Sequence, residues 1–148
     1  MNKLKIGLIG LGQRGAAYGM KDGSIGLLGN ILNNSDVLVT ALCDERKERV
    51  DFAAEKVIAA GQSEPLKTTS YNEVLSSGID AVIVCTSWAS HVEVALAAME
   101  QGISVGIEVG GTHNLEDMKK LVDTYEKTGT PFMFLENCCY YKDELLVT

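Results

Sequence analysis

Three glycines near the start of the chain have the spacing of a phosphate-binding turn. Gly10, Gly12 and Gly15 form a G-x-G-x-x-G pattern directly after the apolar run 4–9. The first glycine allows a tight turn, the second lets the backbone approach a pyrophosphate, and the third lets the next helix pack closely. Unpaired N–H groups and the helix dipole then favour an anion without a basic side chain. The residues assigned to the phosphates are Gly10, Gly12, Gln13, Arg14 and Gly15.

Glycine pairs are common in turns, so the surroundings of this motif must decide its meaning. The β-branched apolar run 37–43 predicts a buried parallel strand, and Asp44 follows it directly. A carboxylate at this position accepts hydrogen bonds from the adenosine ribose of a dinucleotide. The gap from Gly15 is longer than usual, and the Gly/Asn/Ser-rich stretch 21–36, an insertion or a broken helix end, accounts for the excess. Asp44 also fits the N-cap of a helix over 45–54, and the two roles are compatible.

The same carboxylate bears on the choice of cofactor. A negative charge at Asp44 repels a 2′-phosphate, which favours NAD over NADP. Arg46 and Arg49 lie close by in sequence and moderate this preference, because an arginine accommodates the extra phosphate.

Further polar side chains lie at the ends of three more apolar runs, over 80–86, 103–109 and 132–137, or just after them. In an open parallel sheet, the carboxyl ends of the strands form the ligand crevice. We therefore expect these side chains beside the cofactor. They are Thr86, Ser87, Trp88, His91 and Glu108, and the last of the three runs ends in Asn137.

Some of these residues also have structural explanations. His91 fits a buried helix cap, since lone histidines near helix starts are more often structural than catalytic. An acidic residue in so apolar a run as 103–109 needs a hydrogen-bonding partner or solvent, which applies to Glu108. For His113 a surface or capping role is favoured, and Asn114 is the expected cap of the helix that follows.

The order of elements predicts the fold. Strands alternate with helical segments, including a short strand over 67–69, a short helix over 71–75 and a longer helix over 115–128. The inward face of this last helix is assigned to Met118, Leu121, Val122 and Tyr125. Short loops and continuous apolar strands are typical of a doubly wound parallel sheet, the Rossmann type, with three αβα layers. The tail from Cys138 onward is expected to begin another helix.

Composition excludes several classes of protein. The chain has 148 residues, one domain by length, and its formal net charge of −7 argues against nucleic acid and anionic membranes as partners. No apolar run is long enough to span a bilayer, and no signal peptide is recognised. The four cysteines lack C-x-x-C spacing, so core positions are favoured over metal ligands or disulfides. A cytoplasmic, reducing location and no metal site are expected.

The chain resembles the amino-terminal half of the Gfo/Idh/MocA family of sugar oxidoreductases over nearly its whole length. The resemblance is carried by GLGQRG at 10–15, Asp44, CTSWASH at 85–91, ALAAMEQG at 95–102 and Ile107-Glu108. It implies NAD as the cofactor, with Thr86, Trp88 and His91 beside its middle and with Glu108 and Asn137 near the nicotinamide.

One position departs from the family pattern. The family has Glu-Lys-Pro, with a catalytic, substrate-orienting lysine, where this chain has Glu108-Val109-Gly110. A branch similar to the NAD-dependent glycosidases of glycoside hydrolase family 109 has Glu-Val-Pro there, and a tryptophan in the earlier loop, as at Trp88. The segment 135–137, followed by Tyr140-Tyr141, also looks like that branch. In it, transient oxidation of a ring carbon by NAD acidifies the neighbouring C–H and allows elimination of the glycoside.

The resemblance implies a longer enzyme. Family members carry a second α/β domain with most of the substrate contacts, so residues 1–148 are expected to be the dinucleotide-binding domain alone, inactive by itself. The predicted function is hydride transfer at a secondary alcohol carbon of a sugar or polyol. The alternatives are the glycosidase chemistry and a non-catalytic NAD-sensing domain. The catalytic residues stay unassigned, the implied partner is a sugar-like substrate, and a homo-oligomer is left open.

Overall fold

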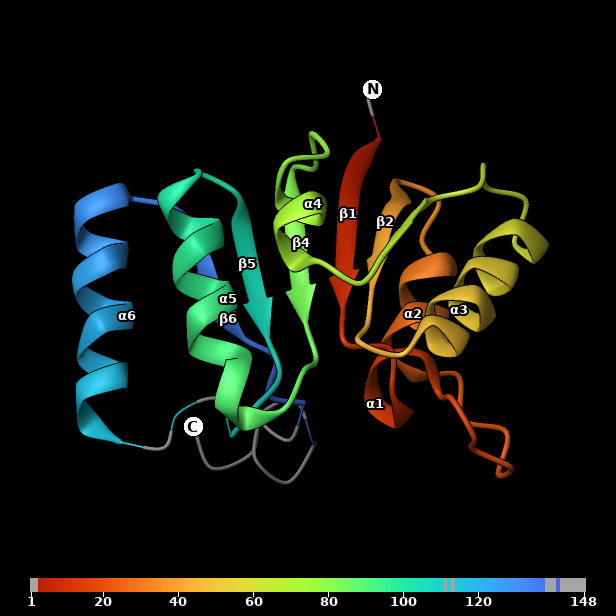
Figure 1. Ribbon diagram of the computed structural model, residues 1–148, viewed down its shortest axis with the longest axis horizontal. Coiled ribbons are helices and arrows are strands. Elements are labelled where there is room, and N and C mark those ends of the chain that lie inside the picture. The colour runs from red at the N-terminus through yellow and green to blue at the C-terminus, as the bar shows by residue number, and fades with distance from the viewer. Residues whose placement is uncertain (1–2, 111, 113, 138–140, 142–148) are drawn as a thin grey trace.

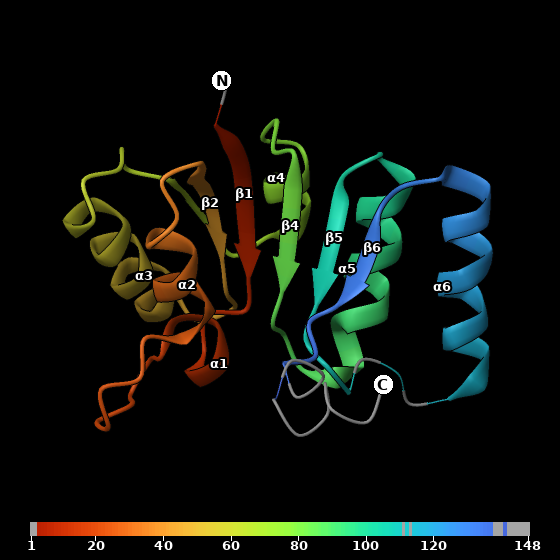
Figure 2. The same ribbon diagram turned by 180° about the vertical axis from the view of Figure 1, so that it is seen from behind.

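A computed structural model describes residues 3–110, 112, 114–137 and 141. Within them, six strands form one parallel sheet in the order β3-β2-β1-β4-β5-β6 (Figures 1 and 2). The strands are β1 (Leu4–Ile9), β2 (Val37–Cys43), β3 (Leu66–Thr68), β4 (Ala81–Val84), β5 (Ser104–Ile107) and β6 (Phe132–Phe134). The helices are α1 (Gln13–Ala16), α2 (Gly26–Leu32), α3 (Lys47–Ala59), α4 (Tyr71–Leu75), α5 (Trp88–Glu100) and α6 (Leu115–Thr128).

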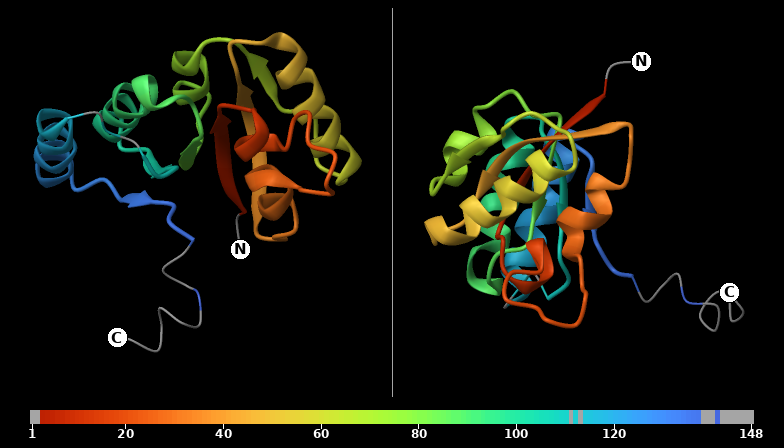
Figure 3. Two further views of the ribbon diagram at one scale, coloured as in Figure 1. Left: turned by 90° about the horizontal axis from the view of Figure 1, so that it is seen from below. Right: turned by 90° about the vertical axis from the view of Figure 1, so that its right-hand side faces the viewer.

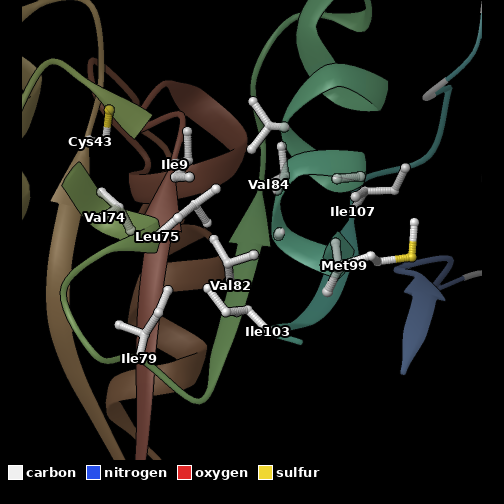
Figure 4. Close-up of a cluster of buried hydrophobic side chains, with 14 of the residues drawn as sticks. Ile9, Cys43, Val74, Leu75, Ile79, Val82, Val84, Met99, Ile103 and Ile107 are labelled. Carbon is white, nitrogen blue, oxygen red and sulfur yellow. The ribbon is translucent and has the colours of Figure 1, made fainter. Parts of the chain in front are cut away.

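Helices cover both faces of the sheet, which gives the three αβα layers (Figure 3). One apolar cluster packs α4, α5 and α6 against β4 and β5, and Val82, Met99 and Ile107 are among its members (Figure 4). The other packs α2 and α3 against β1 and β2 through Leu28, Leu42 and other side chains. The predicted doubly wound fold is therefore confirmed.

The crevice for a ligand lies where the winding reverses. β1 pairs with β2 on one side and with β4 on the other, both in parallel, so the connections leave the sheet in opposite directions at its carboxyl end. The turn after β1 and the loops after β2 and β4 meet there. These loops carry Gly10, Asp44 and Thr86.

Some predictions about the elements need correction. The helix predicted over 45–54 runs from Lys47 to Ala59, and the stretch 21–36 contains the helix α2. Of the four residues assigned to the inward face of α6, only Leu121 is buried, whereas Met118, Val122 and Tyr125 are 37%, 49% and 50% exposed. The physical reason is position: α6 lies at the outer end of the molecule and packs mainly against α5.

Other predictions hold or fall outside the described residues. Asn114 caps α6, because its side chain accepts a hydrogen bond from the N–H of Asp117 at 2.8 Å. Cys43 and Cys85 are free thiols at strand ends, as expected. The predictions for His113, Cys138, Cys139 and the helix in the tail lie outside the described residues.

Candidate dinucleotide-binding site

The glycine turn is built around close backbone contacts. Gly10 has φ +90°, and a Cβ there would lie 2.5 Å from the carbonyl oxygen of Cys85 and 2.6 Å from the nitrogen of Thr86. A Cβ at Gly15 would meet the carbonyl oxygen of Gly10. The first glycine therefore makes the tight turn and the third allows close helix packing, as predicted. At Gly12 the nearest group to such a Cβ is the Arg49 guanidinium, at 3.5 Å.

A cavity of about 780 Å³ opens beside this turn at the carboxyl end of the sheet. Its volume is in the range of small-molecule and cofactor sites. Half of the residues predicted for the site share its lining: Gly10, Gly12, Gln13, Asp44, Thr86 and Ser87.

Asp44 ties the glycine turn to the end of β2. Its Oδ2 accepts hydrogen bonds from the N–H of Leu11 at 2.7 Å and from Arg49 Nη1 at 3.4 Å, and its Oδ1 accepts from the N–H of Arg46 at 3.0 Å. The carboxylate is only 8% exposed. The N-cap of α3 is Arg46, so the alternative of Asp44 as the helix N-cap is wrong. Sequence reasoning missed the bond to Leu11, which joins residues 33 positions apart.

Arg49 supplies positive charge to the cavity wall, whereas Arg46 is not part of that wall. The Arg49 guanidinium lies beside Gly12 and Asp44 and 5.7 Å from the centre of the Tyr18 ring. Its Nε is buried without a hydrogen-bond partner among the described residues. A cation at this place suits an incoming phosphate.

Arg14, Glu108 and Asn137 form a second group. Arg14 Nε donates to Glu108 Oε1 at 2.8 Å, Arg14 Nη2 donates to Asn137 Oδ1 at 3.1 Å, and Asn137 Nδ2 donates to the Tyr141 hydroxyl at 3.2 Å. The bond to Glu108 raises the pKa of Arg14. Glu108, buried directly after β5, thus has the partner that its apolar surroundings require. This group joins α1 to the ends of β5 and β6 and lies outside the lining of the 780 Å³ cavity.

His91 and Trp88 also lie outside that lining. His91 is 1% exposed, and neither ring nitrogen makes a hydrogen bond of good geometry within the described chain. Burial lowers its pKa, which the Thr86 backbone and the Glu108 carboxylate oppose only in part. Trp88 is 58% exposed and covers Gly110, where a Cβ would lie 2.6 Å from the indole Cζ2.

The two thiols beside the cavity are poorly suited to chemistry. Burial raises the pKa of Cys43 to about 11 and that of Cys85 to about 12, so both stay protonated at neutral pH. Among the residues that the structure describes, no three His, Cys, Asp or Glu side chains are grouped so as to hold a metal ion. In the same residues, no helix has the length and apolarity to cross a membrane.

Sequence reasoning missed the far wall of the cavity. Thr69 and Tyr71 follow β3, and Ser90, Glu93 and Val94 lie on α5. The only signal in the sequence is that these residues come soon after strand ends, where a doubly wound sheet places its ligands.

The reversal of winding, the glycine turn and the acidic residue after the second strand together define a dinucleotide-binding protein of the Rossmann type. Residues 4–135 match the family model for GFO_IDH_MocA, described as an oxidoreductase family with an NAD-binding Rossmann fold. The chain belongs to the Gfo/Idh/MocA family, as its sequence suggested.

Two similar curated relatives carry the same name. The chain is 39% identical to a glycosyl hydrolase family 109 protein of Streptomyces filamentosus, over 97% of this chain and 28% of the relative. It is 36% identical to a protein of the same name from Stenotrophomonas maltophilia, over 95% of this chain and 31% of the relative. The chain thus spans about a third of the length of these relatives.

Solved structures share the fold. The WlbA dehydrogenase of Chromobacterium violaceum, crystallised with NADH and UDP-GlcNAcA, superposes with a TM-score of 0.80 at 16% identity, over 99% of this chain and 39% of that one. The WlbA dehydrogenase of Bordetella pertussis, with the same two ligands, gives 0.77 at 22% identity, over 99% and 41%.

Proposed function

We propose that the chain binds NAD in the 780 Å³ cavity, as the cofactor-binding part of an enzyme that acts on a sugar. The observation that carries this is the glycine turn, closed against Cys85 and anchored by Asp44 at the mouth of one cavity. Backbone N–H groups near Gly12, with the Arg49 guanidinium, suit the pyrophosphate. The Asp44 carboxylate suits the ribose hydroxyls, and its charge disfavours a 2′-phosphate.

The cofactor preference tests this proposal. We expect Asp44→Asn to weaken NAD binding about tenfold and NADP binding much less, because a hydrogen bond to a charged group is lost only with NAD. Asparagine keeps one acceptor oxygen for the Leu11 N–H, whereas alanine would also release the glycine turn. Calorimetry with both dinucleotides measures the two affinities, and the exposed Asp36→Asn serves as the control. If neither dinucleotide binds at millimolar concentration, the proposal fails.

Val109 bears on which of two reactions the enzyme catalyses. When bound, NAD supplies a hydride acceptor for a secondary alcohol carbon, either for a net dehydrogenation or, transiently, for elimination of a glycoside. Val109 offers no ammonium to support the reacting hydroxyl, and the curated relatives are named as glycosyl hydrolases. These two observations favour the glycosidase over the dehydrogenase.

Product analysis separates the two reactions. With an enzyme that contains this chain, accumulation of NADH supports the dehydrogenase, whereas sugar release without net NADH supports the glycosidase. We expect the 148-residue chain by itself to bind cofactor without turnover, since it covers only about a third of its relatives. Turnover by this chain alone would contradict that expectation.

A further inference from the structure

Two polar side chains on the far wall of the cavity have no part in the roles given above. Tyr71 begins α4 and Glu93 lies in the second turn of α5, and the Tyr71 hydroxyl donates a hydrogen bond to Glu93 Oε1 at 2.7 Å. Both side chains line the same cavity as the glycine turn. The bond joins the helix after β3 to the helix after β4, across the point where the winding of the sheet reverses.

The order of pyrophosphate, ribose and base in a dinucleotide indicates which part of the ligand lies beside Tyr71 and Glu93. A dinucleotide with its pyrophosphate at Gly12 and its adenosine ribose at Asp44 must place the attached base in the remaining part of the cavity. That part is bounded by Thr69 and Tyr71 after β3 and by α5, where Val94 contributes an apolar surface. A flat heterocycle can pack there, with one edge toward the carboxylate.

The free hydrogen-bonding capacity of the wall defines which edge fits. Asp44 accepts two hydrogen bonds from the protein at Oδ2 and one at Oδ1, and the lone pair that remains on Oδ1 is assigned to the ribose rather than to the base. Glu93 receives the Tyr71 hydroxyl at Oε1, which leaves lone pairs on Oε2 for another donor. A carboxylate accepts and cannot donate, so it pairs with an amino group and is repelled by a carbonyl oxygen.

We propose that Glu93, held in place by Tyr71, selects an adenine base by accepting a hydrogen bond from its 6-amino group. Adenine carries a donor at this position, whereas hypoxanthine and guanine carry an oxygen acceptor. Tyr71 is a positioning residue, and Glu93 determines specificity. The inference rests on the proposed binding of NAD in this cavity.

Hydrogen bonding to Glu93 raises the pKa of Tyr71 above its usual 10, so the hydroxyl remains a donor throughout the neutral range. Glu45 and Asp44 are the other acidic groups on the cavity wall, and Arg49 is the cation there. Arg49 contacts Gly12 and Asp44, so no charge partner from the wall competes for Glu93 in the described contacts.

The test compares NADH with the reduced dinucleotide in which purine replaces adenine, so that the base lacks the 6-amino group and keeps N1 as an acceptor. We expect the unaltered 148-residue chain to bind NADH about tenfold more tightly, the effect of one charge-assisted hydrogen bond. Glu93→Gln should bring the two affinities within about twofold, because a hydrogen bond from the 6-amino group to a neutral amide is weaker than one to a carboxylate and the amide NH₂ can donate to N1 of either base. Tyr71→Phe should reduce the ratio partly, since Glu93 loses its orienting donor.

Glu100→Gln is the matched control, because Glu100 is an exposed glutamate at the end of the same helix and outside the cavity lining. It should leave the tenfold ratio unchanged. Equal affinities in the unaltered chain, or an unchanged ratio in Glu93→Gln, would overturn the inference and leave NAD binding standing. Failure of both dinucleotides to bind would overturn the proposed function as well. Circular dichroism of each variant shows that it is folded.

Discussion

At the scale of single residues, part of the site could be predicted from residue type and spacing. The roles of Gly10 and Gly15 follow from their type and spacing, because only glycine tolerates the φ of +90° at Gly10 and the close backbone contacts at both positions. The hydrogen bond from Leu11 to Asp44 was not predictable, since it depends on strands that are adjacent in space and 33 residues apart in sequence. The same holds for Arg14, whose partners Glu108 and Asn137 lie about a hundred residues further on.

The buried His91 makes stability depend on pH. Burial lowers its pKa below the usual 6.5, so the unfolded chain takes up a proton at a higher pH than the folded chain does. The contribution of neutral His91 to the free energy of unfolding is therefore fully present above pH 6.5. It is lost as the pH falls toward the folded-state pKa, and the free energy of unfolding then decreases by at most about 1.4 kcal/mol per pH unit. We expect His91→Gln to flatten this part of the profile in urea unfolding experiments.

Asn33→Gln, at an exposed residue that carries no titratable group, is the control that should keep the slope. A His91→Gln profile as steep as that of the unaltered chain between pH 7 and 5.5 would contradict this account of the buried ring.

At the level of elements, periodicity located most of the helices but did not show which of their side chains are buried. The pattern over 115–128 gave the bounds of α6 and its cap, because both are local properties. It could not show that most of the apolar stripe stays exposed, since a stripe does not reveal what covers it. The helix α2 was hidden by Gly26, Gly29 and Asn30, which are poor helix formers. Burial of Leu28 in the core stabilises it against that propensity.

The loop after β5 depends on glycine at position 110. Gly110 has φ +84°, and a Cβ added there would meet the Trp88 indole, so a side chain at this position is both strained and obstructed. Proline, the family's residue at this position, requires φ near −65° and cannot adopt this conformation. We expect Gly110→Ala to lower the free energy of unfolding by about 2–3 kcal/mol and to shift the emission of Trp88, the single tryptophan.

Gly129 provides a matched comparison, because it has φ +66° and nothing lies within 4 Å of its added Cβ. Gly129→Ala should therefore cost only the backbone strain, about 1–2 kcal/mol, and leave the emission of Trp88 unchanged. Equal losses of unfolding free energy in the two variants would mean that the contact with Trp88 adds nothing to the cost of Gly110→Ala.

For the whole molecule, the sequence predicted the topology because connection rules leave few alternatives. Continuous apolar strands joined by short helical crossovers admit mainly the right-handed, doubly wound arrangement. The wall made by Tyr71 and Glu93 was not predictable, because it depends on how α4 and α5 approach each other over the sheet. The rule that ligands bind at the carboxyl ends of parallel strands therefore located the crevice but identified only part of its lining.

Ligand binding at this crevice should stabilise the entire domain. With NADH at about a hundred times its dissociation constant, the free energy of unfolding should rise by about 2.7 kcal/mol and the melting temperature by roughly 5–10 °C. ADP-ribose should give most of this shift, because the contacts described here involve the adenosine half and the pyrophosphate. Thermal unfolding monitored by circular dichroism measures both shifts, with nicotinamide riboside as the control that should give none. A melting temperature that NADH leaves unchanged would contradict the assignment of the cavity.

The closure of Gly10 against Cys85 sets an order of assembly during synthesis. A nascent chain that has emerged only as far as residue 60 already holds the glycine turn, β2 and Asp44, and the N–H of Gly10 can already bond to the Cys43 carbonyl. The surface that confines the turn arrives later, with the Cys85 backbone, whose N–H bonds to Ile9. We therefore expect newly made protein on the ribosome to bind a dinucleotide only after β4 and the start of α5 have been translated and have docked beside β1.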